Sequence, residues 1–155
     1  MTLHTGPTYS DRAVSLRLPD VEAVRSASKS VDVAGQVEKW LSRAAEREDV
    51  YYFSVYRGEE LVGQILLHDI DEESGEALVG YHLFQPRWRG LGIGRRALAL
   101  LQIFVVESLR LTRLVVITSS DNVASRKIAR MCGFAHVGAP REDPTGVLMQ
   151  WDVPR

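Results

Sequence analysis

The chain has 155 residues, 45% of them hydrophobic and 25% charged, which suffices for one globular domain with a sizeable core. Its apolar runs are too short to span a membrane, its first residues lack an apolar signal segment, and its single cysteine excludes an internal disulfide. No spacing of cysteine and histidine resembles a zinc site, so we expect no metal. We expect one cytoplasmic domain over residues 1–155, with residues 1–12 flexible and no membrane contact.

The charged residues are distributed unevenly, although the net charge is only −1. Residues 1–76 hold 15 acidic and 8 basic residues (−7), whereas residues 77–155 hold 5 acidic and 11 basic residues (+6). The second part therefore suits an anionic ligand. The first part either attracts a cationic ligand or forms a solvated acidic face. Because the basic residues are few, we do not expect nucleic-acid binding.

Hydrophobic periodicity predicts a mixture of helices and strands along the chain. Asp20 can cap the first helix, and Gly133 suits the end of the last one. The predicted strands are 13–18, 51–56, 61–70, 77–84, 114–118, 134–138 and 147–153, and the predicted helices are 21–28, 33–47, 93–109 and 123–132. Short polar turns join the second, third and fourth strands into an antiparallel meander. The predicted fold class is α/β (α+β), with a mixed, largely antiparallel sheet of about seven strands flanked by helices.

The segment 85–96, QPRWRGLGIGRR, separates a predicted strand from a predicted apolar helix. It has a glycine at every second position from residue 90 to residue 94, and no acidic residue occurs between residues 77 and 106. A glycine loop that opens a helix leaves backbone N–H groups pointing outward at the positive end of the helix dipole. Cations in a first helical turn are locally unfavourable, so Arg95 and Arg96 indicate a bound anion. The alternative is a tight turn with solvated arginines.

Two motifs resemble the GNAT superfamily of N-acetyltransferases. The loop signature of that family is Arg or Gln, two residues, Gly, one residue, and Gly or Ala, which matches Arg89, Gly92 and Gly94. Downstream, the segment 122–134 resembles the family's asparagine-led helix that ends in Gly-Phe. The order of the predicted elements also fits. The resemblance implies the GNAT-like acyl-CoA N-acyltransferase fold, closest in pattern to the branches that acetylate ribosomal proteins or small amines.

The resemblance also implies acetyl-CoA as the co-substrate. The diphosphate would lie on the loop amides, and the pantetheine arm would add like a strand to the backbone before the loop. In this family a bulge splays the sheet at this strand, and Gly80 either eases such a distortion or only relieves packing. Asn122 is either a contact for the pantetheine arm or a helix cap. The implied cofactor-binding residues are His82, Leu83, Phe84, Arg89, Gly90, Leu91, Gly92, Ile93, Gly94, Arg95, Asn122 and Ser125.

The reaction that the resemblance implies is direct attack of an amine on the thioester. Many family members place a tyrosine seven residues after the asparagine to protonate the leaving thiolate, but this chain has Ala129 there. Ser125 matches a serine of related branches and is our candidate for contacting the sulfur, or else it is only a first-turn serine. For the base, Glu76 and His82 share one face of their strand and are the candidates, through water. Tyr81 points to the opposite face, where we expect core.

In this family the first two helices and their connection wall the acceptor site, which here means residues 20–50. An acidic wall would suit a cationic small molecule, such as a polyamine, or a protein N-terminus. We expect Trp40 to pack its helix on the sheet and Trp88 to cover the base of the loop, unless they line the acceptor site. Dimers are common in such families, so a homodimer is a candidate assembly. The acidic residues of the predicted wall are Glu22, Asp32, Glu38, Glu46, Glu48 and Asp49.

Two other functions fit parts of the sequence. The segment 92–97 matches the G-x-G-x-x-A pattern of dinucleotide-binding oxidoreductases. However, antiparallel hairpins precede it, and no acidic residue follows about twenty residues on. The missing tyrosine and the unclear base also fit a non-catalytic acyl-CoA-binding module. The function that we expect is an acetyl-CoA-dependent N-acetyltransferase that acts on a primary amine.

Overall fold

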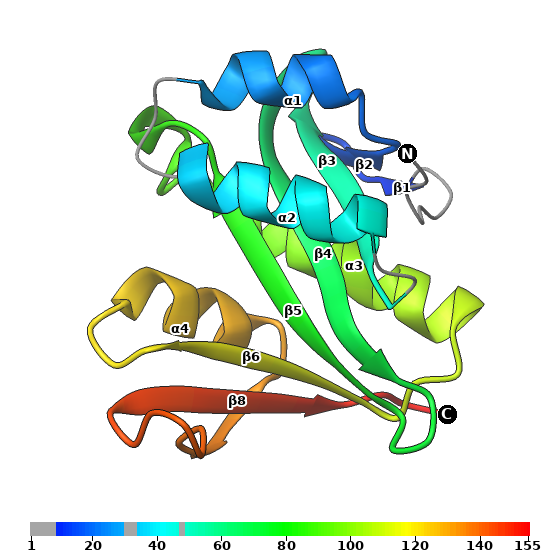
Figure 1. Cartoon of the computed structure of the whole chain (residues 1–155), viewed down its shortest axis with the longest axis vertical. Helices are drawn as coiled ribbons and strands as arrows, with labels where there is room; N and C mark the ends of the chain where they lie inside the picture. The colour runs from blue at the N-terminus through cyan, green and yellow to red at the C-terminus, as the bar shows by residue number, and fades with distance from the viewer. Residues whose placement is uncertain (1–8, 30–33, 47–48) are drawn as a thin grey trace.

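One eight-stranded sheet with helices on both faces makes up the computed structural model, which describes residues 9–29, 34–46 and 49–155 (Figure 1). In chain order the elements are β1 (Tyr9–Ser10), β2 (Val14–Arg17), α1 (Val21–Ser28), α2 (Ala34–Glu46), β3 (Tyr51–Arg57), β4 (Glu60–Asp71), β5 (Glu76–Leu83), the 3₁₀ helix η1 (Pro86–Trp88), α3 (Ile93–Ser108), β6 (Arg113–Ser119), α4 (Val123–Met131), β7 (Ala135–Gly138) and β8 (Gly146–Asp152). The predicted fold class is confirmed. The described residues form one strand more than the sequence predicted, because the short β1 pairs with β2.

Local sequence accounts for where the first helices form. The side chain of Asp20 accepts a hydrogen bond from the N–H of Ala23 at 3.1 Å, so α1 begins where the sequence placed its cap. In α2 the apolar residues at helical spacing are all buried, which includes Trp40 at 8% exposure. The first and last residues of the expected helix 33–47 lie outside the described part of the chain. The first eight of the twelve residues expected to be flexible also lie outside it.

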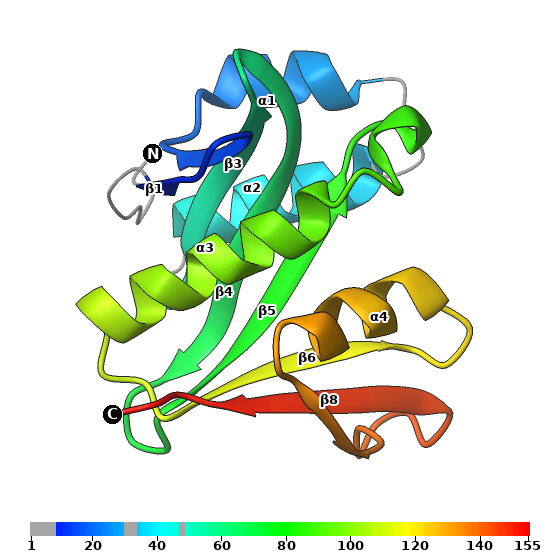
Figure 2. The ribbon, with the colours of Figure 1, turned by 180° about the vertical axis from the view of Figure 1, so that it is seen from behind.

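Two apolar clusters lie on opposite faces of the sheet. The cluster under α1 and α2 contains Tyr52 and Leu66, whereas the neighbouring Phe53 and Ile65 belong to the cluster under α3 and α4. Adjacent strand residues alternate between the faces, which explains this division. Figure 2 shows α3 lying across the face opposite α1 and α2. Because α3 packs on the sheet and on α4, it is buried on most sides, as its apolar sequence predicted.

The sheet changes direction between β5 and β6. The strand order is β1-β2-β3-β4-β5-β6-β8-β7, and every neighbouring pair is antiparallel except β5 and β6, which are parallel. A parallel pair needs a crossover, which α3 supplies. The pairing covers only residues 76–78 of β5 and 113–115 of β6. Beyond it the two strands diverge, so the sheet opens into a V (Figure 1).

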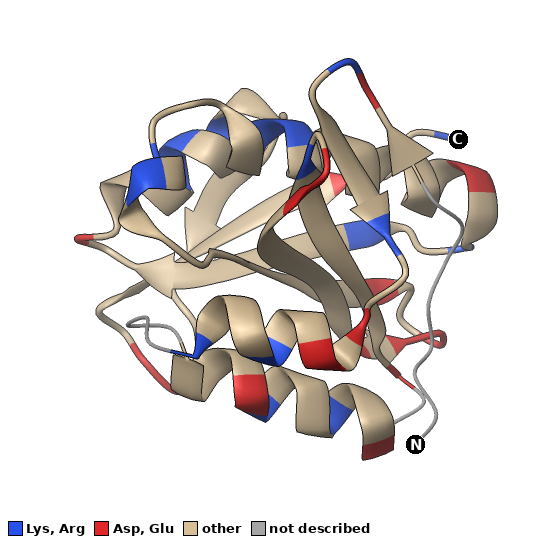
Figure 3. Cartoon of the chain, turned by 90° about the horizontal axis from the view of Figure 1, so that it is seen from above, with Lys and Arg blue, Asp and Glu red and all other residues tan. Residues whose placement is uncertain are grey.

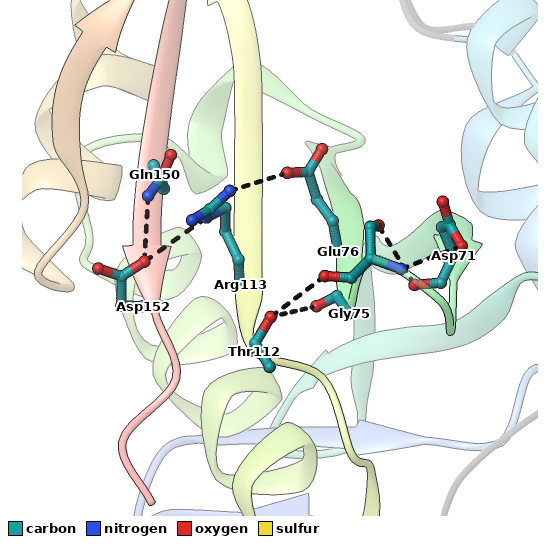
Figure 4. Close-up of polar contacts among 8 residues, drawn as sticks. Asp71, Gly75, Glu76, Thr112, Arg113, Gln150 and Asp152 are labelled. Atoms are coloured by element: carbon teal, nitrogen blue, oxygen red, sulfur yellow. Dashed lines mark hydrogen bonds and ion pairs between the residues drawn. The ribbon is translucent and has the colours of Figure 1, made fainter.

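Hydrogen bonds close the narrow end of this V. The carbonyl oxygen of Gly75 accepts from the N–H groups of Thr112 and Arg113, at 2.7 and 3.0 Å. It also accepts from the Thr112 hydroxyl at 3.2 Å. The Arg113 guanidinium lies 3.6 Å from carboxylate oxygens of Glu76 and Asp152, so it ties β5, β6 and β8 together (Figure 4). The turn before β5 is thereby fixed to the start of β6.

The splay does not arise from the bulge that the sequence predicted. Gly80 pairs in regular register with Leu66, and β5 stays paired with β4 from Leu78 to Leu83. The irregular pairing between β4 and β5 lies instead between His68 and Asp71. The expectation of a bulge at Gly80 is therefore wrong, and the opening results from the divergence of β5 and β6.

Gly75→Ala tests how strongly the narrow end is constrained. Gly75 has a φ of +75°, and a Cβ there would lie 2.5 Å from Oγ1 of Thr112. Gly58 is the matched control, because its φ of +61° is also left-handed but nothing lies within 4 Å of its Cβ position. We expect Gly58→Ala to cost roughly 1 kcal/mol in urea unfolding and Gly75→Ala at least about 1 kcal/mol more. Equal costs would show that the contact with Thr112 does not constrain the turn.

Candidate functional site

A cleft of about 870 Å³ opens where β5 and β6 diverge. Its walls come from β5, the glycine loop, the first turn of α3, the second half of β6 and α4. In the described part of the chain, no aspartate or glutamate lines it. The cleft therefore joins the two motifs that the sequence singled out, which lie about thirty residues apart in the chain.

The glycine loop presents free backbone donors to this cleft. Gly90 and Gly92 have φ angles of +75° and +79°, in the left-handed region that favours glycine. Gly92 is the N-cap residue of α3, so the N–H groups of Ile93, Gly94 and Arg95 have no acceptor within the helix. These residues line the cleft, which is the arrangement that the sequence predicted for an anion site.

The side-chain positions of two loop residues, Gly94 and Leu91, have other surroundings than a ligand in the cleft. A Cβ on Gly94 would lie 2.9 Å from Cδ1 of Ile128 in α4, so this glycine lets α3 and α4 pack closely. Leu91 is 50% exposed and does not line the cleft. Its place among the cofactor-binding residues therefore has no support from its side chain.

The basic residues at the cleft differ in whether an acidic side chain pairs with them. Two of the four loop arginines have acidic partners: Arg87 lies 3.3 Å from Glu60, and Arg96 lies 3.3 Å from Asp11. Three other cations line the cleft without an ion pair to any described residue, namely Arg89, Arg95 and Lys127. A positive cleft without carboxylates favours an anionic ligand.

The backbone of β5 offers one open edge, and Phe84 is not part of it. The N–H of Phe84 donates to the carbonyl oxygen of Val62 at 2.9 Å, so Phe84 faces β4. Because backbone direction alternates along a strand, His82 also faces β4, whereas Leu83 faces the open side toward β6. The side chain of Phe84 lies in the α1–α2 cluster and is 2% exposed. The backbone direction therefore supports Leu83 as a contact for the pantetheine arm, and it does not support Phe84 or the backbone of His82.

Asn122 acts as a helix cap in this structure. Its Oδ1 accepts a hydrogen bond from the N–H of Ser125 at 3.1 Å, which begins α4. Its side-chain amide N–H group makes no hydrogen bond with the described residues, and Asn122 lines the cleft. The contact with the pantetheine arm stays a prediction beside this observed role.

Tyr81 reaches the cleft, although the sequence placed it in the core. Its ring packs against the α3–α4 cluster, on the expected face of β5. Its hydroxyl, however, lies 3.0 Å from the Oγ of Ser125 and 3.0 Å from the Ser125 carbonyl oxygen. Burial raises the pKa of Tyr81, while the hydrogen bond with Ser125 acts in the opposite direction. No sequence pattern links these two residues, because the contact depends on how α4 lies against β5.

His82 belongs to a line of polar side chains on the α1–α2 face. The hydroxyl of the buried Tyr52 donates to Oε1 of Gln64, so the Gln64 Nε2 group, 3.0 Å away from Nδ1 of His82, donates to that nitrogen. The proton of the neutral ring therefore sits on Nε2. Burial lowers the pKa of His82 below its usual 6.5, which keeps the ring neutral at physiological pH. His82 thus presents an N–H donor and not a free base.

Glu76 lies outside the cleft. It is the first residue of β5 and pairs with Arg113 at the closed end of the V (Figure 4). His82 is six residues further along the strand, which corresponds to about 20 Å. The position of Glu76 therefore gives no support to its prediction as the base, because it neither lines the cleft nor lacks a partner.

The predicted acidic wall is partly neutralised. Glu38 of α2 accepts two hydrogen bonds from Arg25 of α1, at 2.9 and 3.1 Å. Both helices carry acidic and basic residues (Figure 3). Asp32 and Glu48 lie outside the described residues. The remaining acids of the wall, among them Glu22, give a mixed surface, so the charge of these helices does not select a cationic acceptor.

Residues 9–29, 34–46 and 49–155 offer neither a metal site nor a membrane span. They contain no group of three or more histidine, cysteine, aspartate or glutamate residues placed to hold a metal ion. None of their helices is both long enough and apolar enough to cross a bilayer.

A glycine loop at a helix N-terminus, beside two parallel strands that diverge, defines an acyl-CoA N-acyltransferase fold. Residues 5–135 match the family model of the acetyltransferase (GNAT) domain. This match covers most of the chain, and the chain therefore belongs to the GNAT family, as its two motifs indicated. A dinucleotide-binding oxidoreductase is excluded by this membership and by the antiparallel strands before the loop.

Several known proteins are similar to this chain. A candidate ribosomal N-acetyltransferase, YdaF of Bacillus subtilis, is 27% identical over 106 residues, which span 68% of this chain and 57% of YdaF. The structure of RimL, a ribosomal L7/L12 α-N-protein acetyltransferase in complex with coenzyme A, has a TM-score of 0.76 at 20% identity and covers 94% of this chain and 97% of RimL. The acetyltransferase MccE, in complex with acetyl-CoA and AMP, has a TM-score of 0.70 at 18% identity and covers 92% and 94%. These structures share the fold.

The hydrogen-bond network around His82 predicts its tautomer and its pH response. Nitrogen NMR shifts should show Nδ1 without a proton at neutral pH, and a protonated Nδ1 would contradict the network. Because the pKa of His82 is lowered in the folded state, protonation favours the unfolded state. Stability in urea should therefore fall as pH drops below about 6.5. The variant His82→Gln should show a shallower fall, with His68, whose pKa burial also lowers, still contributing.

Proposed function

We propose that the chain is an N-acetyltransferase that moves an acetyl group from acetyl-CoA to a primary amine. The observation that carries this proposal is the cleft that runs from the open edge of β5 to the N-terminus of α3, which no carboxylate of the described residues lines. Membership of the GNAT family supports it, and so do the coenzyme A and acetyl-CoA complexes of RimL and MccE. The match to YdaF, at 27% identity, supports the branch.

The residues of the cleft fit coenzyme A. The free N–H groups of Ile93, Gly94 and Arg95 would hold the diphosphate, with cations at the mouth of the cleft. The open backbone edge at Leu83 and the side-chain amide of Asn122 would hold the pantetheine arm. When bound, acetyl-CoA supplies a thioester with an activated acetyl group and a sulfur leaving group. Ser125, at the far wall, is the candidate contact for that sulfur.

The cleft favours an amine that arrives uncharged or loses its proton to water. The described lining contains no carboxylate, and His82 offers a hydrogen on Nε2 rather than a lone pair. We propose that His82 donates a hydrogen bond through this N–H group and so orients a carbonyl oxygen, and that it does not abstract a proton. No side chain of the described lining then serves as the general base that we expected from the sequence.

Protein N-termini are the acceptors that the comparisons favour. RimL is named as a ribosomal L7/L12 α-N-protein acetyltransferase, and YdaF is named as a candidate ribosomal N-acetyltransferase. The mixed charge of α1 and α2 agrees with a peptide acceptor better than with a polycation. An acceptor of this kind would place the chain in the cytoplasm. The expected homodimer stays a prediction.

A non-catalytic acyl-CoA-binding module is the second candidate. One observation favours it: the position where many relatives carry the acid tyrosine is Ala129, which is fully buried. The two functions differ in a simple assay. Acetyl-CoA is mixed with peptides that have free or blocked N-termini, and thiol release is followed. Tight coenzyme A binding without release for any amine, including polyamines and aminoglycosides, would favour the module.

Gly92→Val tests the loop. A side chain at φ +79° strains the N-cap and obstructs the first-turn N–H groups, so we expect at least a tenfold loss of affinity for coenzyme A. Circular dichroism should stay unchanged. Gly58→Val is the matched control, since it introduces the same left-handed strain at a turn outside the cleft lining. Unchanged affinity of Gly92→Val in calorimetry would show that the diphosphate binds elsewhere.

Two substitutions of His82 separate a donor from a base. Glutamine places an N–H group near the position of Nε2, whereas alanine removes it. If His82 is a donor, kcat/KM should fall about tenfold or more for His82→Ala and by much less for His82→Gln. If both variants lost equal activity, and the acidic limb of the pH–rate profile disappeared in both, His82 would be the base after all.

A further inference from the structure

A pair of hydroxyl groups bridges the two walls of the cleft. The Oη of Tyr81, on β5, lies 3.0 Å from Oγ and 3.0 Å from the carbonyl oxygen of Ser125, on α4. Both residues line the cleft, and they are 44 positions apart in the chain. Among the hydrogen bonds of the described residues, these are the contacts that join β5 to α4.

The two distances allow two arrangements of hydrogens. In the first, Tyr81 donates to the carbonyl oxygen of Ser125, and the Ser125 hydroxyl donates to Tyr81. In the second, Tyr81 donates to the Ser125 Oγ, and the Ser125 hydrogen is free to point at a ligand. Rotation of two O–H bonds converts one arrangement into the other without movement of heavy atoms.

Tyr81 is the one phenol that lines the cleft in the described part of the chain, and no carboxylate or thiol lines it. His82 points to the α1–α2 face, where Gln64 holds it, whereas Tyr81 and Ser125 lie on the α3–α4 side. Because burial raises the pKa of Tyr81, its hydroxyl keeps its proton at neutral pH. Lys127 also lines the α4 wall, but among the described residues Tyr81 and Ser125 form the hydrogen bonds that join α4 to β5, so this pair is the candidate route for a proton between the two walls.

We propose that Tyr81 supplies, through Ser125, the proton that the sulfur of coenzyme A takes up when it leaves the acetyl group. This inference rests on the acetyl transfer proposed above. As the amine nitrogen forms its bond to the carbonyl carbon, the carbon–sulfur bond breaks and the sulfur keeps the electron pair. Ser125 gives its hydrogen to the sulfur and takes the phenolic hydrogen of Tyr81. Tyr81 regains a proton from the one that the amine nitrogen releases, carried by water, so no net proton is gained or lost.

Ligand binding tests the contact without turnover. Coenzyme A and desulfo-coenzyme A differ only in the sulfur, and calorimetry gives the ratio of their affinities. At pH 8.5, where a thiol of ordinary pKa is about half ionised, the hydroxyl pair should favour coenzyme A, and Tyr81→Phe should reduce the ratio about tenfold. Ser125→Ala should reduce it equally, and Ser125→Thr, which keeps a hydroxyl, should restore it. Tyr56→Phe is the matched control, because that tyrosine lies outside the cleft lining.

Kinetics supply the second readout. Tyr81→Phe should lower kcat about 100-fold while the KM for acetyl-CoA stays within about twofold, since a proton donor acts on the chemical step. An affinity ratio and a kcat that both match those of Tyr56→Phe would overturn the inference. If Tyr81→Phe alters the affinity ratio but the wild-type chain transfers no acetyl group to any amine, the proposed function and the proton step are both refuted. An altered kcat with an unaltered ratio would place Tyr81 away from the sulfur and likewise overturn it.

Discussion

The site depends on one constraint: the parallel pairing of β5 and β6 ends after three residue pairs. The carbonyl oxygen of Gly75 holds the strands together at that end, and no strand pairing holds them beyond it. The backbone groups on the open side of β5, such as those of Leu83, therefore have no strand partner and stay available for hydrogen bonds. An extended ligand with amide groups would suit this edge, and its availability is a direct consequence of incomplete pairing.

The remaining parts of the cleft follow from the crossover that a parallel pair requires. Because α3 must return across the sheet, its N-terminus lies at the wide end of the V, where Gly92 exposes the first-turn N–H groups. The close packing at Gly94 brings α4 against α3 and sets Ser125 opposite Tyr81. In a cleft without carboxylates, burial keeps His82 neutral and Tyr81 protonated. The cleft thus combines free backbone N–H groups and basic side chains with the hydrogen-bond donors His82 and Tyr81.

Sequence patterns predicted the elements well and the individual contacts unevenly. Caps and helical spacing are local, so α1 and the loop glycines lie where their residues indicated. Alternation along β5 gave the correct faces for His82 and Tyr81, but it carries no information on which residues lie near the cleft. Glu76 therefore lies at the closed end of its strand, beside Arg113, and the N–H of Phe84 is already paired with β4.

The sequence by itself determined the family, the mixed sheet and the glycine loop at the start of α3, because each rests on residues close together in the chain. The tertiary structure alone decided three things: the splay of the sheet, the tautomer of His82 and the partner of Tyr81. Each depends on contacts between segments that are far apart in sequence, such as the 18 positions from Gln64 to His82 and the 44 from Tyr81 to Ser125. Strand register and helix packing fix those contacts, and no local pattern encodes them.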